Sequence, residues 1–274
     1  MTSFDVARCA APCRPKQGWR KATDRILALV RGLHLLLTLG AVLVFVLPAY
    51  VLCLRWRPRA FWGARVFAWA VLRALRVRVS ASGHIRISAR ALLVANHVSW
   101  LDIIAIMSVI DTGFLAKREV GNWPIVGLMA RIHRTIFIDR QRRTSVVRVN
   151  DAIAERLRGG HRILVFPEGT TTDGDRVAPF HAAHFAVVRS LAKDEPALHA
   201  SVHPGAISYS HRHAAWRGDQ SLASHVAGLL RSPSLECRLT FLGPEASSPG
   251  SDYKEMARRT EKRIAFVVGC PGAS

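Results

Sequence analysis

Short apolar runs alternate with longer amphipathic segments from residue 91 toward the C-terminus. Four of the runs have the length of buried strands and lie at 91–96, 113–117, 134–139 and 161–166. Further elements are predicted as helices near 101–110, 122–131, 181–193 and 252–268 and as strands near 200–209 and 235–242. This alternation predicts an α/β fold with a mainly parallel central sheet flanked by helices.

The helix that ends at Gly159-Gly160 has the clearest pattern. Its apolar residues recur at spacings of three and four, at Val146, Val149, Ile153 and Leu157. Charged residues such as Arg148, Glu155 and Arg156 lie between them, and glycine is common just after a helix end. The segment is therefore predicted to bury one face against the sheet.

The N-terminal third has a different pattern. Residues 32–54 contain no Lys, Arg, Asp or Glu over 23 positions, enough for a helix to cross about 30 Å of hydrocarbon. A second apolar segment, 60–75, carries Arg65 and Arg73 among aromatic residues, as in a helix at a membrane interface. Basic residues flank the first segment on both sides, so charge selects no orientation. We expect two helices that dip into one leaflet, with a single spanning helix as the alternative.

These patterns divide the chain into three parts. Residues 1–21 are predicted to be a basic flexible tail, 22–78 membrane-associated helical segments, and 79–274 one α/β domain. Loose alternation over 76–88 favours one more strand, with a turn at Ser82-Gly83. The five cysteines form no CxxC pair, which indicates reduced thiols and neither a disulfide framework nor a zinc site.

The charge balance calls for an anionic partner. The chain has 39 Lys+Arg against 19 Asp+Glu, a formal charge of +20, and its hydrophobic content is 50%. A basic chain this apolar fits anionic membrane lipid better than nucleic acid, and it has no RNA-binding aromatic motif.

Polar clusters follow several predicted strands at their carboxyl ends, where open α/β sheets bind ligands. Asn96-His97 and Asp102 come after the first strand; the later clusters contain Lys117, Arg140 and Glu168-Gly169-Thr170. A neutral imidazole can take a proton from an alcohol, and a nearby carboxylate fixes its tautomer. Because five residues separate His97 from Asp102, they meet only if a loop or helix start lies between them. Lys117 and Arg140 could hold an anionic group or form surface ion pairs with Glu119 and Asp139.

In this order and spacing, the blocks Asn96-His97-x4-Asp102, Phe137-Ile138-Asp139-Arg140 and Phe166-Pro167-Glu168-Gly169-Thr170 resemble the 1-acylglycerol-3-phosphate (lysophosphatidic acid) acyltransferase family, roughly from Leu92 to Tyr209. The resemblance implies a glycerolipid acyltransferase-like fold and a catalytic domain over 79–274. It also implies catalytic roles for His97 and Asp102. Substrate-binding roles follow for Asn96, Lys117, Arg140, Glu168, Gly169 and Thr170. A fourth block, His203-Pro204-Gly205-Ala206-Ile207, departs from the family pattern at Gly205.

The expected activity is acyl transfer from acyl-CoA or acyl-carrier protein to a lysolipid hydroxyl, in phospholipid biosynthesis. No G-x-S-x-G elbow is present, so the acceptor hydroxyl is expected to attack directly, with no metal or bound cofactor. The first expected acceptor is 1-acylglycerol 3-phosphate, which would give phosphatidic acid. The loop FPEGTTTDGDRVAPF looks closer to the lyso-ornithine lipid acyltransferase branch, which is the alternative. A non-catalytic basic membrane-binding module is the alternative from another class. We expect a bacterial inner-membrane protein whose catalytic domain faces the cytoplasm.

Overall fold

The computed structural model describes most of the chain from residue 17 onward. The described residues are 17–41, 43–44, 48, 62–122, 127, 130–131, 133–138, 145–198, 200–218, 220–246 and 252–269. Eight strands form one sheet: β1 (Val77–Gly83), β2 (Ala91–Ala95), β3 (Gly113–Lys117), β4 (Ile136–Ile138), β5 (Ile163–Val165), β6 (Ser201–Tyr209), β7 (Leu235–Phe241) and β8 (Glu245–Ala246).

The strands are ordered β1-β7-β6-β2-β5-β3-β4, and β8 pairs with β6 outside this path. The pairs β1–β7, β6–β2, β2–β5, β5–β3 and β3–β4 are parallel, whereas β6 runs antiparallel to both β7 and β8. The sheet is therefore mixed and mostly parallel, which confirms the predicted α/β class. The carboxyl ends of β2, β3, β4 and β5 meet at one edge, because these neighbours all run in the same direction.

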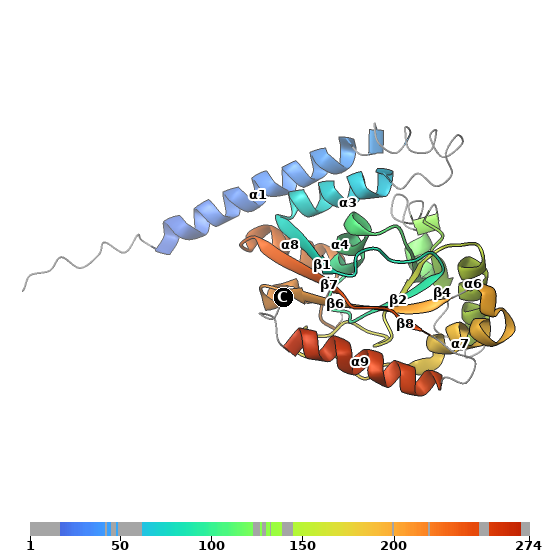
Figure 1. Cartoon of the computed structure of the whole chain (residues 1–274). Coiled ribbons are helices and arrows are strands. Elements are labelled where there is room, and N and C mark those ends of the chain that lie inside the picture. Colours follow the sequence, from blue (N-terminus) through green and yellow to red (C-terminus); the bar gives the residue numbers. More distant parts are fainter. Residues whose placement is uncertain are drawn as a thin grey trace, which may run out of the picture.

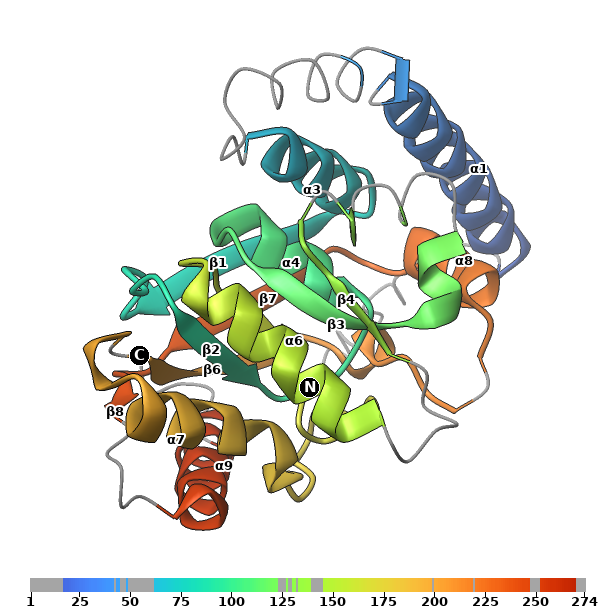
Figure 2. The ribbon, with the colours of Figure 1, turned by 90° about the vertical axis from the view of Figure 1, so that its right-hand side faces the viewer.

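Helices cover both faces of the sheet (Figures 1 and 2). One face packs against α3 (Trp62–Ala74), α4 (Leu101–Val109) and α8 (Leu222–Arg231). The other face packs against α6 (Ser145–Arg158), α7 (Phe185–Asp194) and α9 (Tyr253–Gly269). Strand β2 is buried on both sides, with Leu93 in the first core and Leu92 and Val94 in the second. Its continuous apolar sequence, without alternation, follows from this central position.

Short 3₁₀ helices connect several of these elements: Arg118–Asn122, Ala182–His184, Pro196–Leu198 and Arg212–Ala214. Within the predicted strand 76–88, β1 ends at Gly83, which has a φ of +81°. A Cβ there would lie 2.1 Å from the carbonyl oxygen of Phe241, so only glycine fits this turn. Most of the helix predicted near 122–131 lies outside the described residues.

Helix α8 was not among the elements predicted from the sequence. The Ser221 hydroxyl caps it by accepting a hydrogen bond from Ser224 N at 3.2 Å. Its buried residues are His225 and Leu229, too few to make an apolar period stand out.

The N-terminal helix α1 (Gln17–Ala41) lies beside α3 and α8 on the outside of the first helical layer (Figure 1). It begins within the segment 1–21 that the sequence predicted to be flexible. Among the described residues, no helix combines the length and apolarity needed to cross a membrane. Most of the uncharged segment 32–54 after Ala41 lies outside the described residues.

Helix α3 belongs to the core of the α/β domain. Ala64, Phe67, Ala68 and Val71 are buried in the same cluster as residues of the sheet. The predicted boundary between 78 and 79 falls inside β1, which begins at Val77 and pairs along its length with β7. The amphipathic pattern of 60–75 thus reflects a helix with one face on the sheet and one face exposed.

Candidate active site

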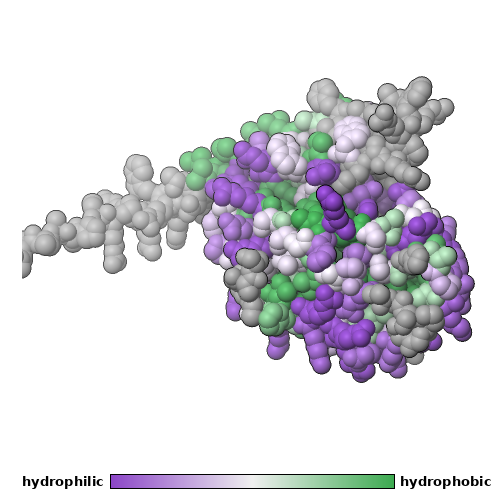
Figure 3. Space-filling model, viewed as in Figure 1, coloured by the Kyte–Doolittle hydropathy of each residue, from purple (hydrophilic) through white to green (hydrophobic). Residues whose placement is uncertain are grey.

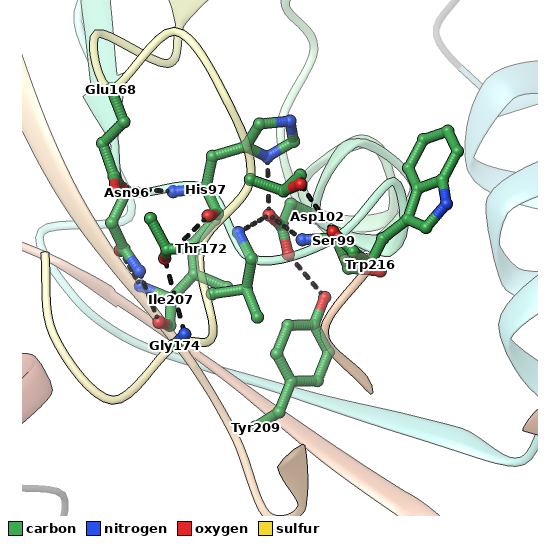
Figure 4. Close-up of polar contacts among 12 residues, drawn as sticks. Asn96, His97, Ser99, Asp102, Glu168, Thr172, Gly174, Ile207, Tyr209 and Trp216 are labelled. Atoms are coloured by element: carbon green, nitrogen blue, oxygen red, sulfur yellow. Dashed lines mark hydrogen bonds and ion pairs between the residues drawn. The ribbon is translucent and has the colours of Figure 1, made fainter. Parts of the chain in front are cut away.

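His97 and Asp102 meet at the carboxyl end of β2. His97 follows the strand by two residues, and Asp102 lies in the first turn of α4. The loop between them turns the chain so that His97 Nδ1 lies 2.9 Å from Asp102 Oδ2 (Figure 4). The Asp102 side chain is fully buried, whereas that of His97 is 19% exposed. The pair thus has a buried orienting carboxylate and an imidazole that is open to a substrate.

Four donors surround the Asp102 carboxylate. Oδ2 accepts hydrogen bonds from Val98 N at 2.7 Å and Ser99 N at 2.9 Å in addition to His97 Nδ1. Oδ1 accepts one from the Tyr209 hydroxyl at 2.7 Å. Because a carboxylate in this setting only accepts, Nδ1 of His97 carries the proton and Nε2 keeps its lone pair. Nε2 is then the atom that can take a proton from a substrate.

The ring of His97 is held by stacking as well as by hydrogen bonding. It lies 4.0 Å from the ring of Phe166, centroid to centroid, with an interplanar angle of 11°. Phe166 follows β5, so two neighbouring strand ends fix the plane of the imidazole. A fixed plane limits how far Nε2 can move and favours proton transfer along one direction.

Glu168 supports the main chain of His97. Its side chain is 5% exposed; Oε1 accepts a hydrogen bond from His97 N at 2.7 Å and Oε2 one from Ala178 N at 3.0 Å. Burial raises the pKa of Glu168 above its ordinary 4.5, while the N–H groups of Ala178 and His97 act in the opposite direction. Both carboxylate oxygens thus accept hydrogen bonds from backbone, and the loop from 168 to 178 is tied to the main chain of His97.

The rest of this loop crosses the His97 segment. Thr172 N and Oγ1 both donate to the carbonyl oxygen of His97, at 2.8 Å and 3.1 Å. Thr171 Oγ1 donates to Trp216 O at 2.6 Å, and Trp216 N donates to Val98 O at 3.0 Å. The His97-Val98 segment therefore lies between two loops that also bond to each other (Figure 4).

Two exposed ion pairs join the same loops. Asp173 pairs with Arg217 at 2.5 Å, and Asp175 pairs with Arg212 at 2.8 Å. Each of these four side chains is at least 46% exposed, so the pairs contribute little to stability. The Asp173–Arg217 pair does place charges of both signs next in sequence to Thr172 and Trp216, which contact the His97 segment.

Asn96 fastens β2 to β6. Its Nδ2 donates to Ile207 O at 2.9 Å, and its Oδ1 accepts from Ile207 N at 2.8 Å. Asn96 is 1% exposed, and both polar ends of the amide face this strand. Gly205 lies beside Ala95 on β6, and a Cβ there would be 3.5 Å from the Phe241 ring. That is an ordinary van der Waals distance, so alanine would fit at Gly205.

The structure describes less of the surroundings of the remaining predicted site residues. Lys117 is the last residue of β3, and its side chain, like the whole of Arg140, lies outside the described parts of the chain. Gly169 has a φ of +72°, which lets the loop turn beside His181. Thr170 is exposed. Within the part of the chain that the structure describes, no group of three His, Cys, Asp or Glu could hold a metal ion.

Sequence reasoning missed Thr172, Trp216 and Tyr209 as members of this site. Thr172 lies in the polar loop that follows Glu168, and its place in that loop was the available signal of a role in the site. Trp216 and Tyr209 reach the site through the pairing of distant segments, so no local pattern indicates their roles.

Comparisons with known proteins match the same region. The profile of the Acyltransferase family matches residues 76–208. The lyso-ornithine lipid O-acyltransferase of Rhizobium meliloti (strain 1021) is 37% identical over 252 residues, which are 84% of this chain and 84% of that protein. The protein of the same name from Brucella abortus (strain 2308) is 34% identical over 209 residues, which are 72% of this chain and 78% of that protein.

A shorter match relates the chain to enzymes with another acceptor. The 1-acyl-sn-glycerol-3-phosphate acyltransferase of Neisseria gonorrhoeae is 43% identical over 94 residues, 34% of this chain and 37% of that protein. The crystal structure of the 1-acyl-sn-glycerophosphate acyltransferase from Thermotoga maritima shares the fold, with a TM-score of 0.67 at 20% identity, over 92% of this chain and 98% of that one. Because its relatives match it over most of its length, the chain is an enzyme that belongs to the acyltransferase family.

Proposed function

We propose that this enzyme transfers an acyl chain from a thioester, acyl-CoA or acyl-carrier protein, to the hydroxyl of a lysolipid, with His97 as general base. The observation that carries this assignment is the His97–Asp102 pair, in which the carboxylate is buried and the far side of the imidazole is accessible. No activated serine or cysteine is needed, because the acceptor itself supplies the nucleophile.

In the proposed reaction, His97 Nε2 takes the proton of the acceptor hydroxyl as its oxygen attacks the thioester carbonyl carbon. A new C–O bond forms and the carbonyl becomes a tetrahedral oxyanion. The buried Asp102 carboxylate stabilises the imidazolium that results. When the oxyanion collapses, the C–S bond breaks and the thiolate takes the proton back from Nε2. His97 is then neutral again, and the products are an ester and a free thiol.

We propose lyso-ornithine lipid as the acceptor. Sequence analysis put lysophosphatidate first, but the support from relatives is longer for the other branch. Relatives named lyso-ornithine lipid O-acyltransferase align over 72% and 84% of this chain, whereas the match with the Neisseria gonorrhoeae enzyme spans 34%. Lysophosphatidate remains the second candidate because that shorter match has the higher identity, 43%.

The substrate-binding residues divide into two groups under this proposal. We assign binding of the acceptor's anionic group to Lys117 and Arg140. We assign to the exposed turn at Gly169-Thr170 the role of letting the acceptor come close to the backbone. Glu168 and Asn96 have all their side-chain oxygen and nitrogen atoms hydrogen-bonded to backbone. We therefore assign them the positioning of the His97 segment, in place of the substrate contact that the family resemblance implied.

A side-by-side assay tests the proposed function. Purified enzyme in mixed micelles is given equal amounts of lyso-ornithine lipid and lysophosphatidate, with acyl-CoA or acyl-carrier protein as donor. We expect esterified ornithine lipid to accumulate faster, as measured by mass spectrometry. Faster formation of phosphatidic acid would establish the second candidate. Failure to acylate either lipid would contradict the proposed function.

We further propose that α1 and α3 attach the enzyme to the inner membrane of a bacterium, with the catalytic domain in the cytoplasm. The support is an apolar surface over α1, visible in green in Figure 3. Its large exposed residues are Ile26, Leu27, Leu29, Val30, Leu33, Leu36 and Leu37. Trp62 and Trp69 are 39% and 64% exposed on α3, beside exposed Arg65 and Arg73. This combination suits an interfacial helix pair on anionic lipid.

Vesicle flotation tests this attachment. Leu29→Glu with Leu36→Glu adds two charges to exposed positions on α1 and should remove binding to anionic vesicles in high salt, where apolar contact dominates. Phe266→Glu is the matched control, because Phe266 is 71% exposed on α9, across the sheet. Equal binding by the double variant and the wild type would contradict the attachment through α1.

A further inference from the structure

The phenol of Tyr209 contacts the catalytic pair from behind. Its hydroxyl donates to Asp102 Oδ1 at 2.7 Å, while the other oxygen, Oδ2, faces His97 (Figure 4). The two residues are 107 positions apart in the chain. No motif contains Tyr209, so its contact with the carboxylate comes from the fold alone.

The sheet determines where this phenol lies. Tyr209 is the last residue of β6 and pairs with Cys237 on β7. Two residues earlier, Ile207 is held by both polar atoms of Asn96, the residue directly before His97. The β2–β6 junction therefore sets the distance from the phenol to Asp102. The hydroxyl cannot leave Oδ1 without a shift of the strand end or a rotation of the ring.

Tyr209 acts as a donor and not as a base. Burial raises the pKa of Tyr209 well above its ordinary value of 10, and the neighbouring Asp102 charge and Cys237 raise it further. The phenol therefore keeps its proton at any pH where the enzyme works. Cys237 is likewise kept as a thiol, because burial raises its pKa. Asp102 is the charged member of this buried group.

A hydrogen bond to Oδ1 has two consequences for His97. It fixes the rotation of the carboxylate, so that Oδ2 stays in line with Nδ1. It also draws negative charge toward Oδ1, which limits how strongly the carboxylate stabilises the imidazolium form. Without it, the imidazolium would be stabilised more, and the neutral base would exist only at higher pH.

We propose that Tyr209 is a positioning residue that holds and partly neutralises Asp102, and so sets the pH range in which His97 is a free base. This inference rests on the proposed function, in which neutral His97 accepts the hydroxyl proton. Tyr209 itself touches no reacting atom. Its effect reaches the substrate through Asp102 and His97.

The test compares Tyr209→Phe with the wild-type enzyme across pH, using full-length protein and saturating acyl donor. We expect kcat at the plateau to fall about three- to tenfold, the size of the net contribution of one typical hydrogen bond. The KM for the lysolipid should stay within about twofold. The acidic limb of the rate profile should move to higher pH by about half a unit. Tyr253→Phe, the same change on α9, should leave all three quantities unaltered.

A second variant keeps the test valid if Tyr209→Phe folds poorly. Site-specific 3-fluorotyrosine at 209 preserves the ring and strengthens the donor, because fluorine makes the phenol more acidic. The acidic limb should then move to lower pH, opposite to the shift in Tyr209→Phe. An unmoved limb overturns the inference even where kcat falls, because poor folding lowers the amount of active enzyme without moving the limb. Full activity of His97→Ala would instead overturn the proposed function.

Discussion

Replacing Asp102 by asparagine separates the charge of the carboxylate from its shape. The amide oxygen can take the place of Oδ2 and accept from Val98 N, Ser99 N and His97 Nδ1. The amide nitrogen then donates to the Tyr209 hydroxyl oxygen, which can accept. All four hydrogen bonds persist in this arrangement, so we expect the melting temperature to change little. What disappears is the negative charge beside the imidazolium.

The size of the loss follows from the geometry. Two unit charges 2.9 Å apart attract by about 6 kcal/mol at an effective dielectric constant of 20. The retained amide bond returns about 1–2 kcal/mol, and water at the 19% exposed His97 ring screens part of the rest. About 3–4 kcal/mol remains, and each 1.36 kcal/mol is tenfold in rate. We therefore expect kcat to fall about 10²–10³-fold.

Steady-state kinetics of Asp102→Asn with lyso-ornithine lipid and a fixed acyl donor measure this loss. The KM for the acceptor should stay within about twofold, because Asp102 is buried and binds no substrate. Asp194→Asn, an exposed position at the end of α7, is the matched control and should retain wild-type kcat. A well-folded Asp102→Asn enzyme with kcat within threefold of the wild type would refute the role given to this charge.

Three further predictions concern neighbouring groups. Glu168→Gln should lower kcat about 10–100-fold with little change in acceptor KM, because the amide group of the glutamine places a donor opposite a backbone N–H. A raised KM with normal kcat would show instead that Glu168 binds substrate. Burial lowers the pKa of His203 from 6.5 to about 4. The native state then binds fewer protons than the unfolded chain between these values, so stability is full above pH 6.5 and is lost as pH falls to 4. His203→Gln should flatten this loss in thermal melts, and an unchanged slope would exclude His203 as its source. Asp173→Asn removes a carboxylate that can pair with the ammonium group of lyso-ornithine lipid, while Arg217 remains. The variant should therefore depress transfer to lyso-ornithine lipid several-fold more than transfer to lysophosphatidate. Equal small effects on both acceptors would show that Asp173 is a solvated turn residue.

The strands and the contact between His97 and Asp102 could be predicted because their signals are local. The apolar run of β2 is continuous, and His97 and Asp102 follow it within seven residues. The chemistry of a histidine beside a carboxylate needs only that the loop between them turn, and the start of α4 supplies that turn. The mostly parallel sheet followed from the same alternation of runs and helices.

The parts that could not be predicted depend on segments distant in the chain. The parallel pairing of β2 with β6 brings Tyr209 to Asp102, and no local pattern encodes that register. Glu168 has the residue type of a ligand-binding group, but its oxygens are taken by the backbone of His97 and Ala178. The amphipathic pattern of 60–75 led to a predicted helix at a membrane interface; in the structure, one face of α3 completes the core of the domain.

The central claim is that His97 Nε2 takes the proton from the acceptor hydroxyl. The most direct measurement is kcat/KM for acyl transfer by His97→Ala, with His161→Ala at the opposite end of β5 as the control. We predict a fall of at least about 10³-fold for His97→Ala, with unchanged folding and membrane binding, and near-normal activity for the control. A folded His97→Ala enzyme within tenfold of the wild type would contradict the claim.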